Sequence, residues 1–148
     1  MKKKLCIILA DYYDEVTDLL VRGATEEILK AESKNIIKKV YGSSPHDIFF
    51  HVPGVFEIPV TISKLIHKFD AFVALGCVIK GETPHFDLIS KAVVNEIMSL
   101  SVKNKKPIGN GIITCLNMKQ ALERADPKGK DMGGAAVLAV LQTLANFK

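Results

Sequence analysis

The chain has 148 residues, a formal net charge of +4 and an apolar content of 48%. These values are typical of one globular domain and exclude a disordered or low-complexity protein. The apolar run at residues 5–10 is shorter than the segment of about 7 to 15 residues in a secretory signal. The run at residues 72–79 is far shorter than the roughly 20 residues of a membrane span. We therefore expect a soluble protein with a single domain, residues 1–148, and no membrane partner.

Cysteine usage and charge say little about partners. Cys6, Cys77 and Cys115 form no metal-ligand spacing, and their odd number suits free thiols in a reducing, cytoplasmic compartment. Cys6 and Cys77 lie within apolar runs, where a cysteine is usually a small buried residue. The basic residues are dispersed and no nucleic-acid motif accompanies them, so we expect no nucleic-acid partner. The mild positive charge fits a small anionic ligand equally well.

Four short segments rich in β-branched residues are predicted strands: residues 4–10, 48–52, 71–78 and 108–114. They are apolar on both faces, which is typical of a parallel sheet covered by helices. Between them, apolar residues recur at spacings of three and four in residues 16–31, 58–66 and 89–100, which predicts amphipathic helices. This alternation predicts a three-layer α/β/α sandwich with ligands at the carboxyl ends of the strands.

The last segment, residues 135–147, is small and apolar on almost every side. One side of such a helix needs cover beyond its own sheet. A subunit interface and a helix buried within the monomer are both compatible with this pattern.

The most informative stretch is GCVIKGETPHFD, residues 76–87, which leaves a predicted strand and enters a predicted helix. Thr83 suits the N-cap and Pro84 suits the first helical position, which places His85 in the first turn. Unpaired amides around residues 81–83 at the positive end of the helix would bind an anion such as phosphate. His85 is then placed to take or give a proton, or it is a solvated first-turn residue.

The second stretch is HVPGVFEIP, residues 51–59, where a strand ends and a helix begins. Its turn can present the Val55 and Phe56 amides, an aromatic ring and the Glu57 carboxylate, a set that suits a flat heterocycle with polar edges. Alternatively, Phe56 belongs to the core and Glu57 complements the helix dipole. Tyr12, directly after the first strand, adds a stacking face.

Arg124 lies in the third stretch, QALERA, shortly before GGAA and the last helix. A guanidinium group is well suited to bidentate contact with phosphate. A solvated helical arginine is the alternative for this residue taken alone.

Together and in this order, the motifs VPGVFEIP, GCVIKGETPHFD, GNGIIT, NMKQALERA and GGAA closely resemble the 6,7-dimethyl-8-ribityllumazine synthase family of riboflavin biosynthesis. The resemblance runs from the first strand to the last helix. It implies a flavodoxin-like sandwich with a four-stranded parallel sheet, assembled as a pentamer with active sites between neighbouring subunits. Some members build larger shells from pentamers.

The implied reaction is that of a transferase, which condenses 5-amino-6-(D-ribitylamino)uracil with 3,4-dihydroxy-2-butanone 4-phosphate and releases phosphate and water. The resemblance implies two small-molecule substrates, no metal, no organic cofactor and riboflavin synthase as a further partner. His85 matches the acid/base position of the family. The positions implied to bind the butanone phosphate are Glu82, Thr83 and Arg124. The positions implied to bind the ribitylaminouracil are Tyr12, Val55, Phe56, Glu57, Cys77, Val78, Ile79 and, from an adjacent subunit, Asn110.

This sequence departs from the family pattern at three places. Residues 11–13 are Asp-Tyr-Tyr where many members have Arg-Phe-Asn, although Tyr12 keeps the aromatic function. Met132 stands where many members carry a lysine, so either Lys128 or Lys130 substitutes for it or the affinity for the uracil is lower. The short segment before the first strand favours a pentamer or decamer over a closed shell.

Two other classes of protein share parts of this pattern. A signalling receiver domain has the same alternating layout, but it needs a phosphoacceptor aspartate at the end of the third strand, where this chain has Gly76 and Cys77. A non-catalytic family member that carries flavin or lumazine stays open because of Met132. Binding without turnover would distinguish such a carrier from the enzyme.

Overall fold

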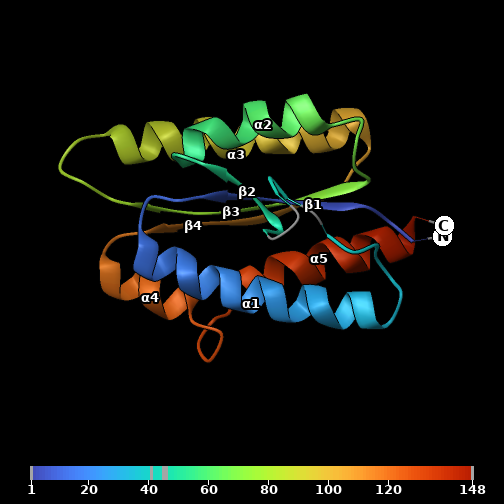
Figure 1. Cartoon of the computed structure of the whole chain (residues 1–148). Coiled ribbons are helices and arrows are strands. Elements are labelled where there is room, and N and C mark those ends of the chain that lie inside the picture. The colour runs from blue at the N-terminus through green and yellow to red at the C-terminus, as the bar shows by residue number, and fades with distance from the viewer. Residues whose placement is uncertain (1, 41, 45–46, 148) are drawn as a thin grey trace.

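The computed structural model describes residues 2–40, 42–44 and 47–147. Its four strands form one parallel sheet with the order β2-β1-β3-β4 (Figure 1). The bounds of the strands are β1 Leu5–Ala10, β2 Phe49–Val52, β3 Ala71–Ile79 and β4 Ile108–Cys115. The four strands predicted from the sequence are thus confirmed, with ends that differ by one residue.

One of these differences has a visible cause. The sequence predicts that the first strand begins at residue 4, but the Lys4 amide donates to the Asp70 carboxylate at 2.7 Å. Because the Lys4 amide donates to a side chain and not to a neighbouring strand, β1 begins at Leu5.

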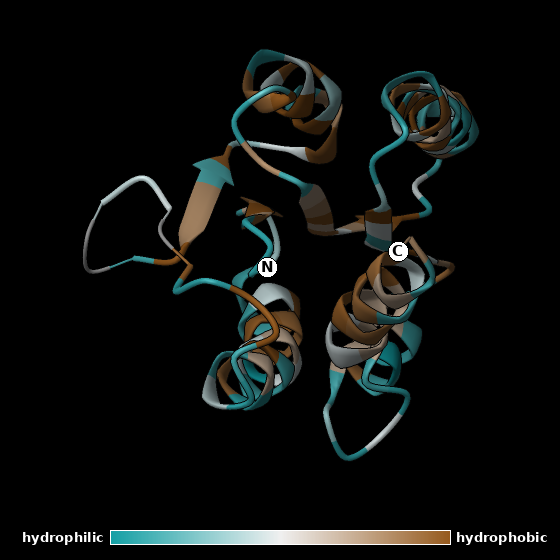
Figure 2. Cartoon of the chain, turned by 90° about the vertical axis from the view of Figure 1, so that its right-hand side faces the viewer, coloured by the Kyte–Doolittle hydropathy of each residue, from teal (hydrophilic) through white to brown (hydrophobic). Residues whose placement is uncertain are grey.

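Five α-helices cover the sheet: α1 Asp14–Ser33, α2 Ile58–Leu65, α3 His85–Asn104, α4 Met118–Ala125 and α5 Met132–Asn146. Helices α2 and α3 lie on one face of the sheet, and α1, α4 and α5 lie on the other (Figure 1). The view roughly along the helices shows the same layers from the end (Figure 2). The predicted three-layer, flavodoxin-like α/β/α sandwich is confirmed.

Successive residues of β1 supply the two halves of the core. Ile7 and Leu9 pack in a buried cluster with residues of α1 and α5. Cys6 and Ile8 pack in a second buried cluster with residues of α2 and α3. Because neighbouring side chains of a strand point to opposite faces, a strand covered on both faces needs an unbroken apolar run.

Helix α5 buries one side against the rest of the chain. Its glycine pair packs directly on α1: a Cβ atom on Gly133 would lie 2.2 Å from the Leu20 carbonyl oxygen. Ala136, Val137 and Val140 are buried in the cluster shared with α1. Burial within the monomer, one of the two alternatives for this segment, therefore explains one face of the helix. Leu138 on the helix stays 43% exposed in the single chain, so a subunit interface stays open for it.

All three cysteines are free and buried, as expected from their spacing. Within the described ranges, no helix combines the length and the apolarity needed to cross a membrane.

We expect Gly133→Ala to lower the free energy of unfolding by about 1–3 kcal/mol, the usual cost of an overpacked core. The added methyl group would meet a backbone oxygen of α1, which cannot turn away as a flexible side chain does. Urea denaturation followed by circular dichroism measures the change. Gly81→Ala is the control, since a Cβ atom there meets nothing within 4 Å, and it should stay within about 0.5 kcal/mol of the parent. Equal stability of Gly133→Ala and the parent would contradict the close helix contact.

Candidate functional site

A pocket of about 550 Å³ opens where the carboxyl ends of β1, β2 and β3 meet the start of α3. Parallel strands deliver the turns that follow them to one edge of a sheet, which is where ligands of open α/β sheets bind. The residues that line this pocket, called the crevice below, are Tyr12, Tyr13, Gly54, Val55, Phe56, Cys77, Val78, Ile79, His85 and Ile89. The structure thus brings together seven of the site residues predicted from the sequence.

Two aromatic side chains stand at the crevice with much of their surface free. Tyr12 is 70% exposed and Phe56 is 64% exposed in the single chain. Large apolar rings are usually covered in a folded protein, so exposed rings beside a pocket indicate a binding surface. The alternative that Phe56 belongs to the core of the chain is therefore wrong.

Tyr13 is a crevice residue that the sequence analysis missed. Its ring packs edge-on against that of Tyr12, with 4.9 Å between the ring centroids. Burial, and then the neighbouring Tyr12 and Cys77, raise the pKa of the Tyr13 phenol above its ordinary value. The group therefore stays protonated at neutral pH and brings an O–H donor to the crevice. Its place directly after Tyr12, at the end of the first strand, could have indicated it as a crevice residue.

A short 3₁₀ helix, η1 Val55–Glu57, shapes the crevice beside Tyr12. The Glu57 amide donates to the Gly54 carbonyl oxygen at 3.2 Å, which closes the turn. Val55 anchors the turn, with 8% of its surface exposed. A Cβ atom on Gly76 would lie 2.8 Å from Val55 Cγ1, so glycine at this position of β3 lets the turn settle onto the sheet.

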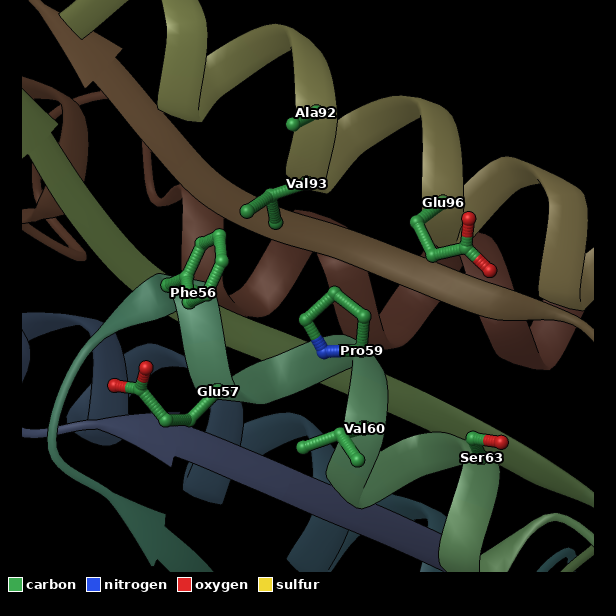
Figure 3. A pocket seen from close by; sticks show the side chains of 8 residues that line it. All are labelled: Phe56, Glu57, Pro59, Val60, Ser63, Ala92, Val93 and Glu96. Atoms are coloured by element: carbon green, nitrogen blue, oxygen red, sulfur yellow. The ribbon is translucent and has the colours of Figure 1, made fainter. Parts of the chain in front are cut away.

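Glu57 lies outside the crevice, on a second pocket of about 630 Å³ between α2 and α3. Phe56 lines both pockets. Figure 3 shows its ring directed toward Val93 of α3, while the Glu57 carboxylate points away from that helix. The walls of the second pocket are otherwise mostly apolar, with Pro59, Val60 and Ala92.

The end of β3 forms the floor of the crevice. Cys77 is 5% exposed, and Val78 and Ile79 are half-buried. Burial, and then the neighbouring Cys115, raise the pKa of the Cys77 thiol to about 12. Burial also raises the pKa of Cys115, although the charge of Arg124 opposes that shift.

The turn before α3 differs from the prediction in one respect. The sequence predicts Thr83 as N-cap and Pro84 as the first helical residue, but α3 begins at His85 and Pro84 is the N-cap. The first helical hydrogen bond runs from the Leu88 amide to the Pro84 carbonyl oxygen at 3.2 Å. Proline fixes φ near its helical value, and here φ is −70°. It offers no side-chain acceptor, so the amides of the first turn receive no cap from it.

Glu82 and Thr83 are exposed on this turn, next to the crevice rather than inside it. A Cβ atom on Gly81 would meet nothing within 4 Å. The turn is therefore open to a ligand that reaches the first amides of α3, a helix of 20 residues.

Arg124 lies in the last turn of α4, and its guanidinium group reaches back to the end of β4. Its Nη1 atom donates to the Thr114 carbonyl oxygen at 2.8 Å and lies 4.0 Å from Cys115 Sγ. The Lys80 amide donates to the Cys115 carbonyl oxygen at 2.9 Å, which ties the turn before α3 to the same strand end. Arg124 is thus an exposed helical residue, as the alternative expects, and its guanidinium group is in addition held by a carbonyl oxygen of β4.

Two positions named from the sequence lie away from the crevice. Asn110 pairs with Ala74 in the middle of β4, and its side chain accepts from the Ile112 amide at 3.1 Å. Asn110 is exposed on an edge strand, so it does not complete the crevice of its own chain. Met132 is half-buried against the cluster that holds Val16, Leu20 and Cys77.

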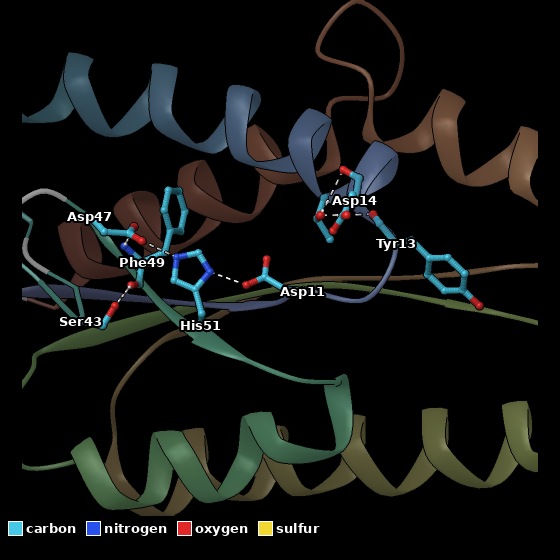
Figure 4. Close-up of polar contacts among 8 residues, drawn as sticks. Asp11, Tyr13, Asp14, Ser43, Asp47, Phe49 and His51 are labelled. Carbon is cyan, nitrogen blue, oxygen red and sulfur yellow. Dashed lines mark hydrogen bonds and ion pairs between the residues drawn. The ribbon is translucent and has the colours of Figure 1, made fainter.

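A polar cluster beside the crevice was also missed. His51, near the end of β2, contacts Asp11 through Nδ1 and Asp47 through Nε2, the latter at 2.5 Å (Figure 4). Partial burial lowers the pKa of His51, but the hydrogen bonds to Asp11 and Asp47 and their charges together outweigh it. The pKa therefore lies above its ordinary value of 6.5. Residues 11 and 51 are 40 positions apart, and nothing in the local sequence pairs them.

In the part of the chain that the structure describes, His, Cys, Asp and Glu side chains form no group of three or more with the arrangement to hold a metal ion. The polar groups at this edge of the sheet include backbone amides, the Arg124 guanidinium, the phenols of Tyr12 and Tyr13, and the imidazole of His85. Such groups recognise an aromatic heterocycle and an anion and can move protons between them.

Comparisons with known proteins agree with this geometry. A family model described as 6,7-dimethyl-8-ribityllumazine synthase matches residues 2–148. A protein of Limosilactobacillus reuteri with that name is 38% identical over 141 residues, which cover 94% of this chain and 86% of that protein. A Rhodopseudomonas palustris protein named 6,7-dimethyl-8-ribityllumazine synthase 1 is 37% identical over 95% of this chain and 83% of its own length. A Campylobacter curvus protein named 6,7-dimethyl-8-ribityllumazine synthase is 36% identical, with coverage of 99% and 90%.

Proposed function

The chain belongs to the 6,7-dimethyl-8-ribityllumazine synthase family, and we propose that it catalyses the reaction of that family in riboflavin biosynthesis. In that reaction 5-amino-6-(D-ribitylamino)uracil condenses with 3,4-dihydroxy-2-butanone 4-phosphate, and phosphate and water leave. The observation that carries the proposal is the single crevice that joins Tyr12, Phe56, the end of β3 and His85.

The aminouracil half of the site is proposed at the ends of β1, β2 and β3. The exposed rings of Tyr12 and Phe56 offer faces on which a pyrimidine can stack. The amides that open η1, together with the Glu57 carboxylate, suit the hydroxyl groups of a ribityl chain. The backbone of residues 77–79 is within reach of the polar edge of the ring, because these residues form the floor of the crevice.

The phosphate half is proposed between the turn at residues 81–83 and Arg124. The first amides of α3 point their N–H groups out of the helix, and the helix dipole favours an anion there. A guanidinium group has five N–H donors, and both contacts with β4 are made by the same atom, Nη1. Arg124 therefore keeps donors for a phosphate while its position is held by the Thr114 carbonyl oxygen.

His85 is proposed as the proton carrier, because its ring lines the crevice between these two halves. The amine first attacks the ketone and expels water to form an imine. A base then removes a proton as phosphate leaves, and the enol that results takes up a proton to become a ketone. The ribitylamino nitrogen attacks that carbonyl carbon and closes the ring as a second water leaves. One imidazole can serve several of these steps in turn, since each leaves the ring ready for the next transfer.

We expect His85→Ala to slow lumazine formation by about 10² to 10⁴, the usual contribution of a positioned acid or base. The remaining rate reflects two substrates held together, which by itself accelerates the condensation. Absorbance and fluorescence of the lumazine after mixing both substrates measure the rate. His67→Ala is the control: His67 is an exposed histidine in the turn after α2 and does not line the crevice, so this variant should react at the parental rate. Binding of the aminouracil without product in the parent protein would instead identify a carrier.

We expect Arg124→Ala to raise the KM for the butanone phosphate about tenfold or more, the factor for a lost hydrogen bond to a charged group. The KM for the aminouracil should change much less, because Arg124 does not line the crevice proposed for it. Steady-state kinetics with each substrate varied in turn separate the two constants. Arg22→Ala on α1 is the matched control, and equal effects on both substrates would contradict a phosphate contact.

The assembly is proposed as a pentamer with sites shared between subunits, and an apolar face of the single chain supports this. Val60 of α2 and Leu88, Met98 and Val102 of α3 are each more than 60% exposed. Val60 also lines the mostly apolar pocket between these two helices (Figure 3). Exposed large apolar side chains in such number are typical of a surface that contacts another protein. Asn110 needs a neighbouring chain if it is to reach a uracil ring.

We expect Val60→Glu to convert the assembly into smaller species, because it places a charge on this apolar face. Analytical ultracentrifugation gives the mass of the particle, and the parent should sediment as a multiple of five chains. Leu29→Glu on α1, where Leu29 is 58% exposed, should leave the mass unchanged. A monomeric parent protein would contradict shared active sites.

Further parts of the proposal follow from the family. The chain works as one domain in the cytoplasm, which the buried free thiols support. Riboflavin synthase is the proposed partner, since it consumes the lumazine product.

A further inference from the structure

The His51 cluster joins three segments that meet beside the crevice. Leu9 pairs with His51 in the sheet, and Asp11 lies two residues beyond Leu9, on the same side of the sheet as His51. Asp47 lies in the segment before β2, where its Oδ1 atom accepts from the Phe49 amide at 3.0 Å and its own amide donates to the Ser44 carbonyl oxygen at 3.1 Å. Figure 4 shows the imidazole between the two carboxylates.

The hydrogen-bond pattern defines the charge of the ring. An ionised carboxylate only accepts hydrogen bonds, so each ring nitrogen that faces one must carry a proton. Nδ1 faces Asp11 and Nε2 faces Asp47. The arrangement is therefore satisfied only by an imidazolium. A neutral ring would turn a lone pair toward one of the two carboxylates.

The charged groups around the ring come from the segments on either side of it. Among the described residues, the charges that act on His51 are those of Asp11 after β1 and Asp47 before β2. On β2 itself, the Phe49 ring lies edge-on with its centroid 6.3 Å from that of the imidazole. The side chains of His51 and Asp11 are each 39% exposed, so solvent weakens these pairs without removing them.

Asp11 connects this cluster to the crevice through the backbone. Its amide donates to the Val52 carbonyl oxygen at 2.9 Å, directly beside His51, and the next amide, that of Tyr12, donates to the Ala10 carbonyl oxygen. Tyr12 and Tyr13, the two residues after Asp11, both line the crevice. Loss of the contact between His51 and Asp11 would therefore loosen the turn that carries the Tyr12 ring.

We propose that His51 is a positioning residue: as an imidazolium it bridges Asp11 and Asp47, and this bridge holds the turn that carries Tyr12 in place for the aminouracil. The inference rests on the proposed function only for the identity of that ligand. We therefore expect the affinity for the aminouracil to depend on the protonation of His51. The affinity for the butanone phosphate should not depend on it.

The direction of the pH effect follows from the proton count. Because the folded-state pKa of His51 lies above its ordinary value, the bridge is complete at pH values below about 6.5 and is lost as the pH rises through the folded-state value. The KM for the aminouracil should rise over that interval by about two- to fivefold, the range for a partly exposed ion pair. The KM for the butanone phosphate should not follow it.

The test compares the parent with His51→Gln across this pH range, with both KM values and kcat measured by lumazine formation. A glutamine amide carries no charge and does not titrate, so the variant should show the higher KM for the aminouracil at every pH. Its kcat profile should match that of the parent, since His51 touches no reacting group. Asp47→Asn removes one of the two carboxylates and should move the rise in KM to lower pH. His67→Gln is the matched control and should keep the parental profile.

Two results would overturn the proposal: a parental pH dependence of KM in His51→Gln, or a loss of kcat at unchanged KM. A purely structural role would lower the stability of His51→Gln and leave both KM profiles alone. The difference in unfolding free energy between parent and His51→Gln needs no substrate. It should be largest at about pH 6, where the imidazolium faces two ionised carboxylates, and fade as the pH rises. If that difference is found while the parent makes no lumazine, the proposed function fails and the imidazolium bridge stands.

Discussion

The parallel direction of the four strands is the constraint on which the rest of the molecule depends. Because every strand points the same way, each crossover must return over a face of the sheet, and each strand end opens at the same edge. Residues 71–75 of β3 are all fully buried as a result, covered by helices on both sides. The chemistry-bearing segments follow the strands and are therefore collected in one place, although they are up to about a hundred positions apart.

The strand order places different chemical groups at the two ends of this edge. The turns after β1 and β2 are neighbours in the sheet and supply aromatic rings, while the ends of β3 and β4 are neighbours and supply helix amides and a guanidinium. The order β2-β1-β3-β4 thus places the proposed surface for a flat ring beside the proposed surface for an anion. His85 lines the crevice between these proposed halves. This arrangement suits a reaction that joins a heterocyclic amine to a phosphorylated ketone.

The strands, the main helices and most of the crevice could be predicted from the sequence, since they depend on local patterns. Unbroken apolar runs define β1 and β3, and the residues that follow a strand can be expected at its carboxyl end. The start of α3 was predicted one residue early, because proline is common both at the N-cap and just after it. No local rule predicts that Asn110 lies away from the crevice of its own chain. The contact of His51 with Asp11 depends on strand register, which period-two alternation alone does not supply.

The thiol of Cys77 has a consequence for the chemistry of the crevice floor. Because its pKa is raised to about 12, almost none of it is thiolate at neutral pH, and the thiolate is the form that attacks carbonyl carbons and is oxidised by peroxides. In the proposed site, this thiol would therefore pack against a substrate as a hydrocarbon group does and would form no hemithioketal with a ketone bound nearby. The floor of the crevice thus contributes shape, and its sulfur atom does not compete with the substrate amine as a nucleophile.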